Sequence, residues 1–229
     1  MCGRYTLIDT TAAAAELRRW LDVDFPDIPA RYNVAPSQLN PTVAAEDPGR
    51  PRVAMMRWGL APFWDRASNP RIAPINARAE GILGKPMFRQ SVQRRRCLAP
   101  ADGFYEWKSL AQGTKIPHFI RMRNRAPFFL AGIFEAGLEG RPETYAILTT
   151  RANALMLGLH DRMPVILGGE TARKWLAPGP LGEESLAALC APCAADEMEA
   201  FPVARVVNSP KNDGPECIVP AAGSDRLFE

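Results

Sequence analysis

Short apolar runs separated by proline and glycine place the strongest constraint on the fold of this chain. Seven such runs, each four to nine residues long, occur at residues 41–46, 52–60, 118–123, 128–136, 144–150, 164–168 and 204–207. Runs of this length between turn residues are typical of β-strands. They are too short to cross a membrane as helices, which takes about 18 or more apolar residues. The pattern therefore predicts a sheet-rich protein without a membrane span.

Fewer segments have helical patterns. Residues 10–22 predict a helix with Thr10 or Thr11 as its N-cap, and residues 2–8 before it predict a strand. Shorter helices are expected at residues 77–83, 169–177 and 183–191. No repeat, low-complexity tract or linker divides the sequence. We therefore expect one α+β domain over residues 1–229, with a curved, mostly antiparallel, barrel-like sheet as its core and helices at its periphery.

Composition and charge narrow the class of protein. Apolar residues make up 47% and charged residues 23% of the 229 positions, as in ordinary globular proteins. No secretory signal is visible, so we expect a reducing cytosol and no disulfide framework from the five cysteines. The net charge of +3 is too small to indicate a polyanionic partner by itself. Many arginines adjoin aromatic residues, Gly or Pro, where they are either phosphate ligands or solvated surface charges.

Cys2 is the first candidate for chemistry. An initiator Met that precedes a small residue is generally removed, which would leave Cys2 with a free α-amine and a thiol. The pKa of the amine is about 8 and that of the thiol about 8.5, so a fraction of each group is deprotonated at neutral pH. The amine can condense with an aldehyde, and the thiol can then close a five-membered thiazolidine ring. The alternative is a buried cysteine at the start of an edge strand.

Four polar residues in loop-like segments could assist this chemistry. Glu106 lies between two aromatic residues, where burial should raise its pKa and suit it to proton transfer; it could also be an exposed strand residue. His160 lies in a polar loop, whereas His118 in a strand-like run is expected to be structural. Asn76 and Arg78 could orient a substrate and bind a phosphate, or could cap the helix that follows.

Cys190 and Cys193 form a C-x-x-C motif. Such a pair is found in redox proteins and as half of a zinc site. No second pair and no suitably spaced His is present, and the motif follows a predicted helix instead of opening one. We therefore expect neither a metal nor a redox function, and no other cofactor.

Several blocks of the sequence together resemble the SRAP family (SOS response-associated peptidases), which shields abasic sites in single-stranded DNA. The blocks are MCGRY at 1–5, RYNVAP at 31–36, RWGLAPFW at 57–64, PINARAE at 74–80, CLAPADGFYEWK at 97–108, HDRMPVIL at 160–167 and VVNSPKNDGPE at 206–216. Each block is weak alone, but the ordered set is specific and spans nearly the whole chain. The resemblance implies the SRAP fold.

The resemblance also implies roles for individual residues. Cys2 would be the covalent nucleophile that forms a thiazolidine with the ring-opened abasic sugar after Met1 is removed. Asn76, Glu106 and His160 would complete the catalytic set: Asn76 contacts the sugar, Glu106 shuttles protons and His160 assists Schiff-base formation. The DNA-binding residues would be Arg4, Pro36, Phe63, Trp64, Arg78, Thr149 and Arg162.

One local difference from the family pattern concerns the base-stacking residues. Family members can carry two tryptophans after W-G-x-A-P, where this chain has Phe63 and Trp64. An aromatic pair remains, so stacking on bases should survive. The implied partner is single-stranded DNA with abasic sites, bound by a monomer, without a membrane or a cofactor. Two other functions stay open: a thiol (auto)peptidase with Cys2 as nucleophile, and a non-catalytic module that binds single-stranded DNA.

Overall fold

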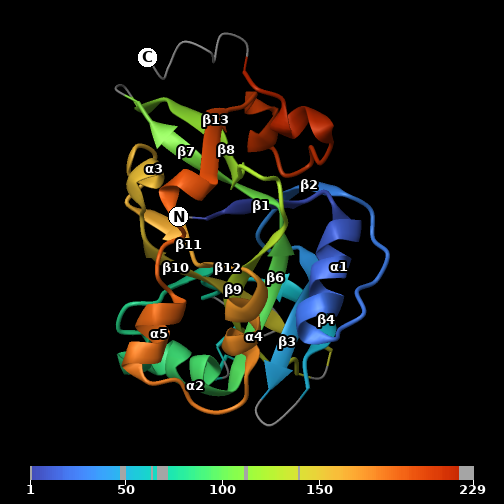
Figure 1. The fold of residues 1–229 in the computed structure, drawn as a ribbon, viewed down its shortest axis with the longest axis vertical. Helices are drawn as coiled ribbons and strands as arrows, with labels where there is room; N and C mark the ends of the chain where they lie inside the picture. Colours follow the sequence, from blue (N-terminus) through green and yellow to red (C-terminus); the bar gives the residue numbers. More distant parts are fainter. Residues whose placement is uncertain are drawn as a thin grey trace.

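A closed ring of strands forms the larger part of the structure (Figure 1). The computed structural model describes residues 2–46, 50–62, 64–65, 72–110, 113–138 and 140–221. Within them, β10, β4, β3, β6 and β9 follow one another, and β9 pairs again with β10. The ring and the strands attached to it comprise β3 (Leu39–Glu46), β4 (Arg52–Trp58), β5 (Asn76–Arg78), β6 (Arg95–Ala101), β9 (Phe128–Glu135), β10 (Thr144–Arg151), β11 (Arg162–Pro164) and β12 (Ile166–Leu167).

A second, five-stranded sheet lies above this ring in Figure 1. Its order is β13-β8-β7-β1-β2, and every neighbouring pair in it is antiparallel. The strands are β1 (Arg4–Leu7), β2 (Arg31–Val34), β7 (Gly103–Ser109), β8 (Lys115–Met122) and β13 (Met198–Pro202). In the larger sheet β10 pairs in parallel with β4 and with β5. The predicted mixed, mostly antiparallel and barrel-like fold is therefore confirmed.

Helices cover the outside of the larger sheet. These are α1 (Thr10–Leu21), α2 (Pro86–Arg94), α4 (Gly169–Leu176) and α5 (Glu183–Leu189), while the short α3 (Ala154–Leu157) lies near the N-terminus in Figure 1. Single 3-10 turns occur at η1 (Ile82–Gly84), η3 (Ala195–Glu197), η4 (Arg205–Asn208) and η5 (Pro215–Ile218). None of the helices in the described segments is long and apolar enough to cross a membrane.

The apolar core lies in three clusters. One joins the larger sheet to α1, α2, α4 and α5, and a smaller one lies beneath the C-terminal 3-10 turns. The third lies between the two sheets and combines Tyr5 and Phe104 from the small sheet with Leu130 and Ile147 from the large one. Within it the hydroxyls of Tyr5 and Tyr145 are 3.0 Å apart. Cys2 belongs to this third cluster, so the core between the sheets holds the N-terminus in place.

Some local predictions are wrong because tertiary pairing outweighs local propensity. The helix predicted at residues 10–22 is confirmed, but Asp9 is its N-cap and accepts a hydrogen bond from the Ala12 amide at 2.8 Å. Residues 77–83 are not a helix, because β5 pairs with β10 and Gly81 turns the chain with φ of 64°. Where a strand is predicted at residues 204–207, the chain forms the 3-10 turn η4 (Arg205–Asn208).

Candidate functional site

Cys2 lies two residues before the start of β1, and 1% of its surface is exposed. The side chains of Met156, Met163 and Met198 belong to the same apolar cluster. Burial, and secondarily the negative charge of Glu106, raise the pKa of the Cys2 thiol to about 12. The thiol is therefore protonated at neutral pH, and its attack on any electrophile requires a base. Met1, whose removal the sequence predicts, lies outside the described residues.

Asn76 binds directly to Cys2. It opens β5, where its parallel pairing with Ile147 of β10 fixes its place. Its Nδ2 donates to the carbonyl oxygen of Cys2 at 2.8 Å. Its Oδ1 is buried and has no hydrogen-bond partner among the residues that the structure describes. A buried acceptor without a partner is costly, so this oxygen is suited to accept a hydrogen bond from an amine or from a bound hydroxyl.

Glu106 is placed near Cys2 by the pairing of β7 with β1. The residue is 6% exposed, and its carboxylate accepts a hydrogen bond from the Trp107 amide at 3.0 Å. It lies close enough to Cys2 for its charge to raise the pKa of the thiol. On the next strand, β8, His118 stands opposite Glu106; burial lowers the pKa of this histidine. Glu106 is thus a buried strand residue, and the exposed-strand alternative for it is excluded.

His160 lies in the loop between α3 and β11. Its Nδ1 accepts a hydrogen bond from the Arg162 amide at 2.9 Å and is 2.7 Å from Oδ1 of Asp161. Nδ1 is thus held between the Arg162 amide and the Asp161 carboxylate, and Nε2 has no hydrogen-bond partner among the described residues. The side chain is 31% exposed, so the ring remains accessible to a substrate.

Arg162 and Thr149 are joined by hydrogen bonds. Arg162 forms a two-pronged ion pair with Glu80, with distances of 2.9 and 2.7 Å, and it also donates to the carbonyl oxygen of Thr149 at 2.6 Å. The Arg162 side chain is 12% exposed, while that of Glu80 is 52% exposed. Hydrogen bonding from Arg162 lowers the pKa of Glu80. The exposed side of this arginine is therefore already occupied by a carboxylate.

Arg78 lies next to this pair, because it is in register with Thr149 across β5 and β10. It is exposed, and no side chain or carbonyl in the described segments accepts a hydrogen bond from its guanidinium. Lys85 is close by and donates to the Arg78 carbonyl at 3.2 Å; burial and the positive charge of Arg78 lower the pKa of this lysine. Arg78 and Lys85 thus form a small positive surface. Lys85 could not be predicted from the sequence, because no local motif marks it.

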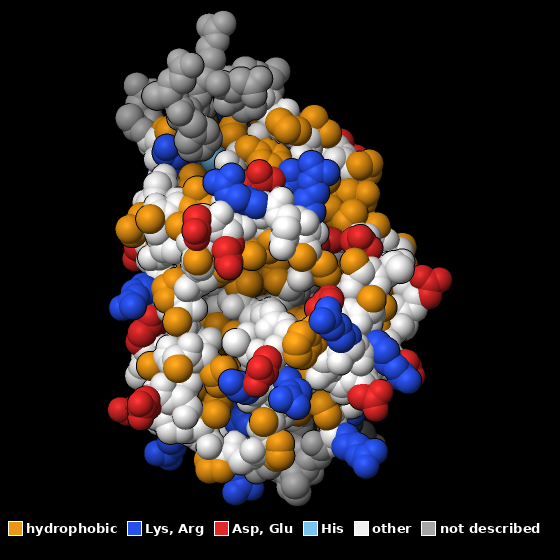
Figure 2. Space-filling model, in the orientation of Figure 1, with side chains coloured by type: hydrophobic (Ala, Val, Ile, Leu, Met, Phe, Trp, Pro, Cys, Tyr) orange, Lys and Arg blue, Asp and Glu red, His pale blue; other side chains and the backbone are white. Residues whose placement is uncertain are grey.

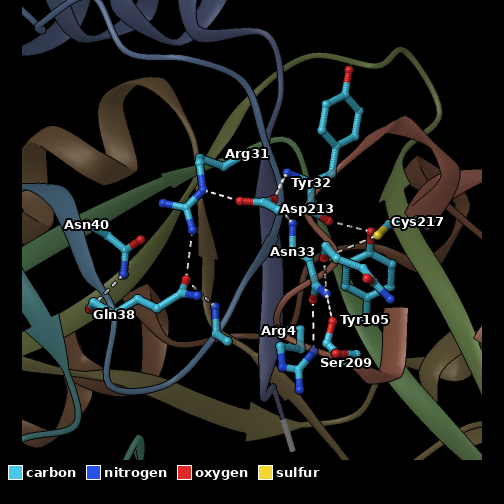
Figure 3. A network of polar contacts seen from close by, with 12 residues as sticks. Arg4, Arg31, Tyr32, Asn33, Gln38, Asn40, Tyr105, Ser209, Asp213 and Cys217 are labelled. Carbon is cyan, nitrogen blue, oxygen red and sulfur yellow. Dashed lines mark hydrogen bonds and ion pairs between the residues drawn. The ribbon is translucent and has the colours of Figure 1, made fainter. Parts of the chain in front are cut away.

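Arg4 belongs to the network of polar contacts that Figure 3 shows. Its guanidinium donates to Oδ1 of Asn33 and to the Val207 carbonyl at 2.9 Å each, and to the Asn208 carbonyl at 3.3 Å. It also lies 5.9 Å from the centre of the Trp107 ring. Burial lowers the pKa of Arg4. These contacts fasten β1 to the segment 207–208, and they occupy donors that the predicted phosphate contact would use.

Asn33 and Asp213 complete the network that Figure 3 shows. The completely buried Asn33 donates to the carbonyl oxygens of Val207, Ser209 and Asn212 at 2.7 to 3.1 Å. Asp213 accepts from the amides of Tyr32 and Asn33 and pairs with Arg31. The sequence analysis missed both roles, because they depend on segments about 180 positions apart. Their presence in the blocks RYNVAP and NSPKNDG was the only available signal.

The predicted base-contacting residues lie on loops. Pro36 is half-buried in the turn after β2, and Trp64 is 51% exposed. Phe63 lies outside the described residues. On the face that Figure 2 shows, Lys and Arg side chains are interspersed with Asp and Glu and form no single basic patch. The charge on this face therefore does not by itself indicate a binding surface for DNA.

The four remaining cysteines are free thiols. No group of three or more potential metal ligands occurs within the described ranges. Burial raises the pKa of Cys190 to about 12; burial and then Glu197 raise that of Cys193 to about 11. Redox exchange proceeds through thiolates, so these environments disfavour it.

The sequence matches a known protein family. A sequence model of the family described as SOS response associated peptidase (SRAP) matches residues 1–210. The chain belongs to the SRAP family. The blocks around Cys2, Asn76, Glu106 and His160 all fall inside the SRAP match.

The relatives of this SRAP chain bear names that refer to abasic sites. Abasic site processing protein YoqW of Bacillus subtilis is 43% identical over 223 residues, which cover 95% of this chain and 99% of the relative. Abasic site processing protein YedK of Escherichia coli is 33% identical over 231 residues, covering 96% and 100%. Abasic site processing protein HMCES of the rat is 30% identical over 247 residues, covering 90% and 69%.

Solved structures resemble this SRAP chain along most of its length. A crystal structure of a protein from Bacteroides thetaiotaomicron superimposes with a TM-score of 0.79 at 28% identity, covering 96% of this chain and 100% of the other. A phage-related protein from Bordetella bronchiseptica gives a TM-score of 0.70 at 29% identity, covering 88% and 94%.

Proposed function

We propose that the protein binds abasic sites in single-stranded DNA and links to them covalently through Cys2 after Met1 is removed. The observation that carries the proposal is the grouping at Cys2: the Asn76 amide is bonded to its carbonyl, and the buried Glu106 carboxylate lies beside its thiol. The names of the relatives support an abasic site as the target. An abasic deoxyribose is a masked aldehyde flanked by phosphates, which suits an aminothiol with nearby arginines.

The proposed reaction has two bond-forming steps. The α-amine of Cys2 attacks the aldehyde carbon of the ring-opened sugar, and the resulting carbinolamine loses water to give an imine. The thiol sulfur then attacks the imine carbon, the thiol proton leaves through a base, and the imine nitrogen gains a proton. The product is a thiazolidine, and one water is released overall. Ring closure is intramolecular and therefore favourable.

Glu106 and His160 would move the protons of these steps. Glu106 is the carboxylate whose charge acts on the Cys2 thiol, whose pKa is about 12, so we assign it the removal of the thiol proton and the opening of the sugar ring. His160, with Nδ1 bonded to the Arg162 amide, would donate from Nε2 to the departing hydroxyl. Asn76 would hold the Cys2 carbonyl with Nδ2 and accept from the substrate with Oδ1.

The DNA strand would be held by a few charged contacts and by stacking. Arg78 is exposed and unpaired among the described residues, so we assign it a phosphate next to the lesion. A second phosphate would displace the exposed Glu80 carboxylate from Arg162 and then contact Arg162 and Thr149. Arg4, Pro36, Phe63 and Trp64 remain proposed DNA contacts. Binding by a monomer should be sensitive to salt and nearly independent of sequence.

Substitution of Cys2 tests the proposal. Wild-type protein incubated with abasic single-stranded DNA should give an adduct that survives denaturing electrophoresis, with an intact mass equal to protein without Met1 plus DNA minus one water. Cys2→Ala should give no such adduct. Cys2→Ser is a matched control of similar size; both variants keep the α-amine once Met1 is removed, so each should be trapped on the DNA only when borohydride reduces the imine.

Other outcomes would select another function. A stable adduct with Cys2→Ala would reject the thiazolidine. Wild-type protein that binds the DNA without any adduct would support a non-catalytic module. Cleavage of generic peptides that disappears with Cys2→Ala would support a thiol peptidase.

A further inference from the structure

A cavity of about 410 Å³ lies at the end of β4, and none of the predicted site residues lines it. Its wall includes three arginines and one carboxylate: Arg57, Arg95, Arg141 and Glu135. Cavities of a few hundred Å³ are of the size that small ligands occupy. The excess of arginine over carboxylate indicates a negatively charged occupant.

The four charged side chains of the cavity differ in what they already bind. Arg95 pairs with Glu135 at 2.8 Å, and both side chains are largely buried. Arg141 donates to the carbonyl oxygen of Asp65 at 3.1 Å. The guanidinium of Arg57 has no hydrogen-bond or ion-pair partner within the described part of the chain. Arg57 is therefore the cation that is available to a ligand.

The cavity adjoins the Cys2 site through a shared segment. Ile75 lines the cavity, and its carbonyl accepts a hydrogen bond from Nε1 of Trp58 at 2.9 Å. The next residue, Asn76, binds the carbonyl of Cys2. Ser37 and Pro62 also line the cavity, and they neighbour the loop residues proposed to contact DNA bases. The cavity and the Cys2 site thus share the segment 75–76.

We propose that this cavity binds a backbone phosphate of a nucleotide flanking the abasic site, with Arg57 as its principal ligand. The inference rests on the proposed function, since it takes the DNA strand to be anchored at Cys2. Arginine's planar fork forms two parallel hydrogen bonds to a phosphate, which gives both affinity and position. The same chemistry would also bind a free phosphate, so the test separates the two sources.

The test measures equilibrium binding to DNA that cannot react. Single strands carry a borohydride-reduced abasic site, which lacks the aldehyde, and are extended by one nucleotide at a time on either side. For the wild type, affinity should rise about tenfold once the extension on one side reaches the cavity. Arg57→Gln should remove this rise and make the salt dependence shallower by about 0.7 in log K against log salt, as expected for one lost phosphate.

Two further variants control the result. Arg52→Gln removes an arginine on the same strand that pairs with Glu143 outside the cavity, so it should keep the length dependence. Arg57→Lys retains the charge and should restore the salt dependence but only part of the affinity. Thermal melting of each variant checks that it is folded.

Several results would overturn the inference. These are equal losses in Arg57→Gln and Arg52→Gln, unchanged length dependence in Arg57→Gln, or inorganic phosphate binding at Arg57 without any effect of strand length. Adduct formation by the wild type on a short unreduced abasic strand reports the proposed function separately. If that adduct is absent while the length dependence persists, the covalent step fails and the phosphate site stands.

Discussion

Glu106 is buried, and its charge acts on the Cys2 thiol, so its substitution tests proton transfer separately from DNA binding. We expect Glu106→Gln to slow adduct formation and its reversal by about 100-fold or more, since a positioned acid–base group contributes that much. Affinity for reduced abasic DNA should stay nearly unchanged. Single-turnover assays on denaturing gels measure the two rates.

A matched variant shows whether the effect is specific. Glu184→Gln changes an exposed carboxylate in the first turn of α5 and should leave both rates unchanged. Equal rates for wild type and Glu106→Gln would remove Glu106 from the mechanism.

Arg78 is exposed and has no side-chain partner in the described structure, so its removal should affect binding without affecting folding. We expect Arg78→Ala to weaken binding of abasic single strands by ~1–3 kcal/mol, the contribution of a charged hydrogen bond. Fluorescence anisotropy at low salt measures the affinity. Arg89→Ala, an exposed arginine on α2, is the control. Full affinity of Arg78→Ala at low salt would leave this arginine with no DNA contact.

At the scale of elements, Asn33 joins β2 to the C-terminal turns. Its side chain bonds to three carbonyl oxygens and to Arg4 while completely buried. Asn33→Ala leaves these groups without partners, so we expect the free energy of unfolding to fall by ~2–4 kcal/mol. Urea denaturation measures this as a lower midpoint at constant slope. Asn124→Ala, at an exposed turn, should change it by less than ~1 kcal/mol; an equal loss in both variants would contradict the role of Asn33.

Elements differ in how far the sequence alone could predict them. Periodic and bounded segments, such as the helix at residues 10–22 and the runs that become β9 and β10, follow from local pattern. β5 does not, because only its pairing with β10 makes Asn76–Arg78 a strand. The same distinction applies to the site. Local motifs and the family blocks predicted roles for Cys2 and Asn76, which the structure joins by a hydrogen bond, whereas the inward contacts of Arg4 depend on a segment more than 200 positions away.

At the scale of the whole molecule, several thiols are buried in the core. Burial raises the pKa of Cys2 and Cys190 to about 12 and that of Cys97 further. In the unfolded chain a thiol loses its proton near pH 8.5, while the folded protein keeps it. Stability should therefore fall as pH rises from about 8.5 towards 12, by up to ~1.4 kcal/mol per pH unit for each thiol.

Urea unfolding at pH 8 and pH 10 measures this dependence. Cys190→Ala should show a smaller loss between the two pH values than the wild type. The same slope in both proteins would show that this thiol does not contribute. The buried tyrosines add to this loss from about pH 10, where they ionise in the unfolded chain, and they add equally in both proteins.

The position of β1 has a mechanical consequence. β1 is an inner strand, paired with β7 on one side and β2 on the other, and Arg4 fastens it to the turn at residues 207–208. If DNA is linked at Cys2, a motor protein that pulls on the DNA applies its load along β1. The strand's hydrogen bonds then resist in shear and must break together instead of one after another. Such an anchor would withstand a pulling force that would strip a tail attached at the sheet's edge.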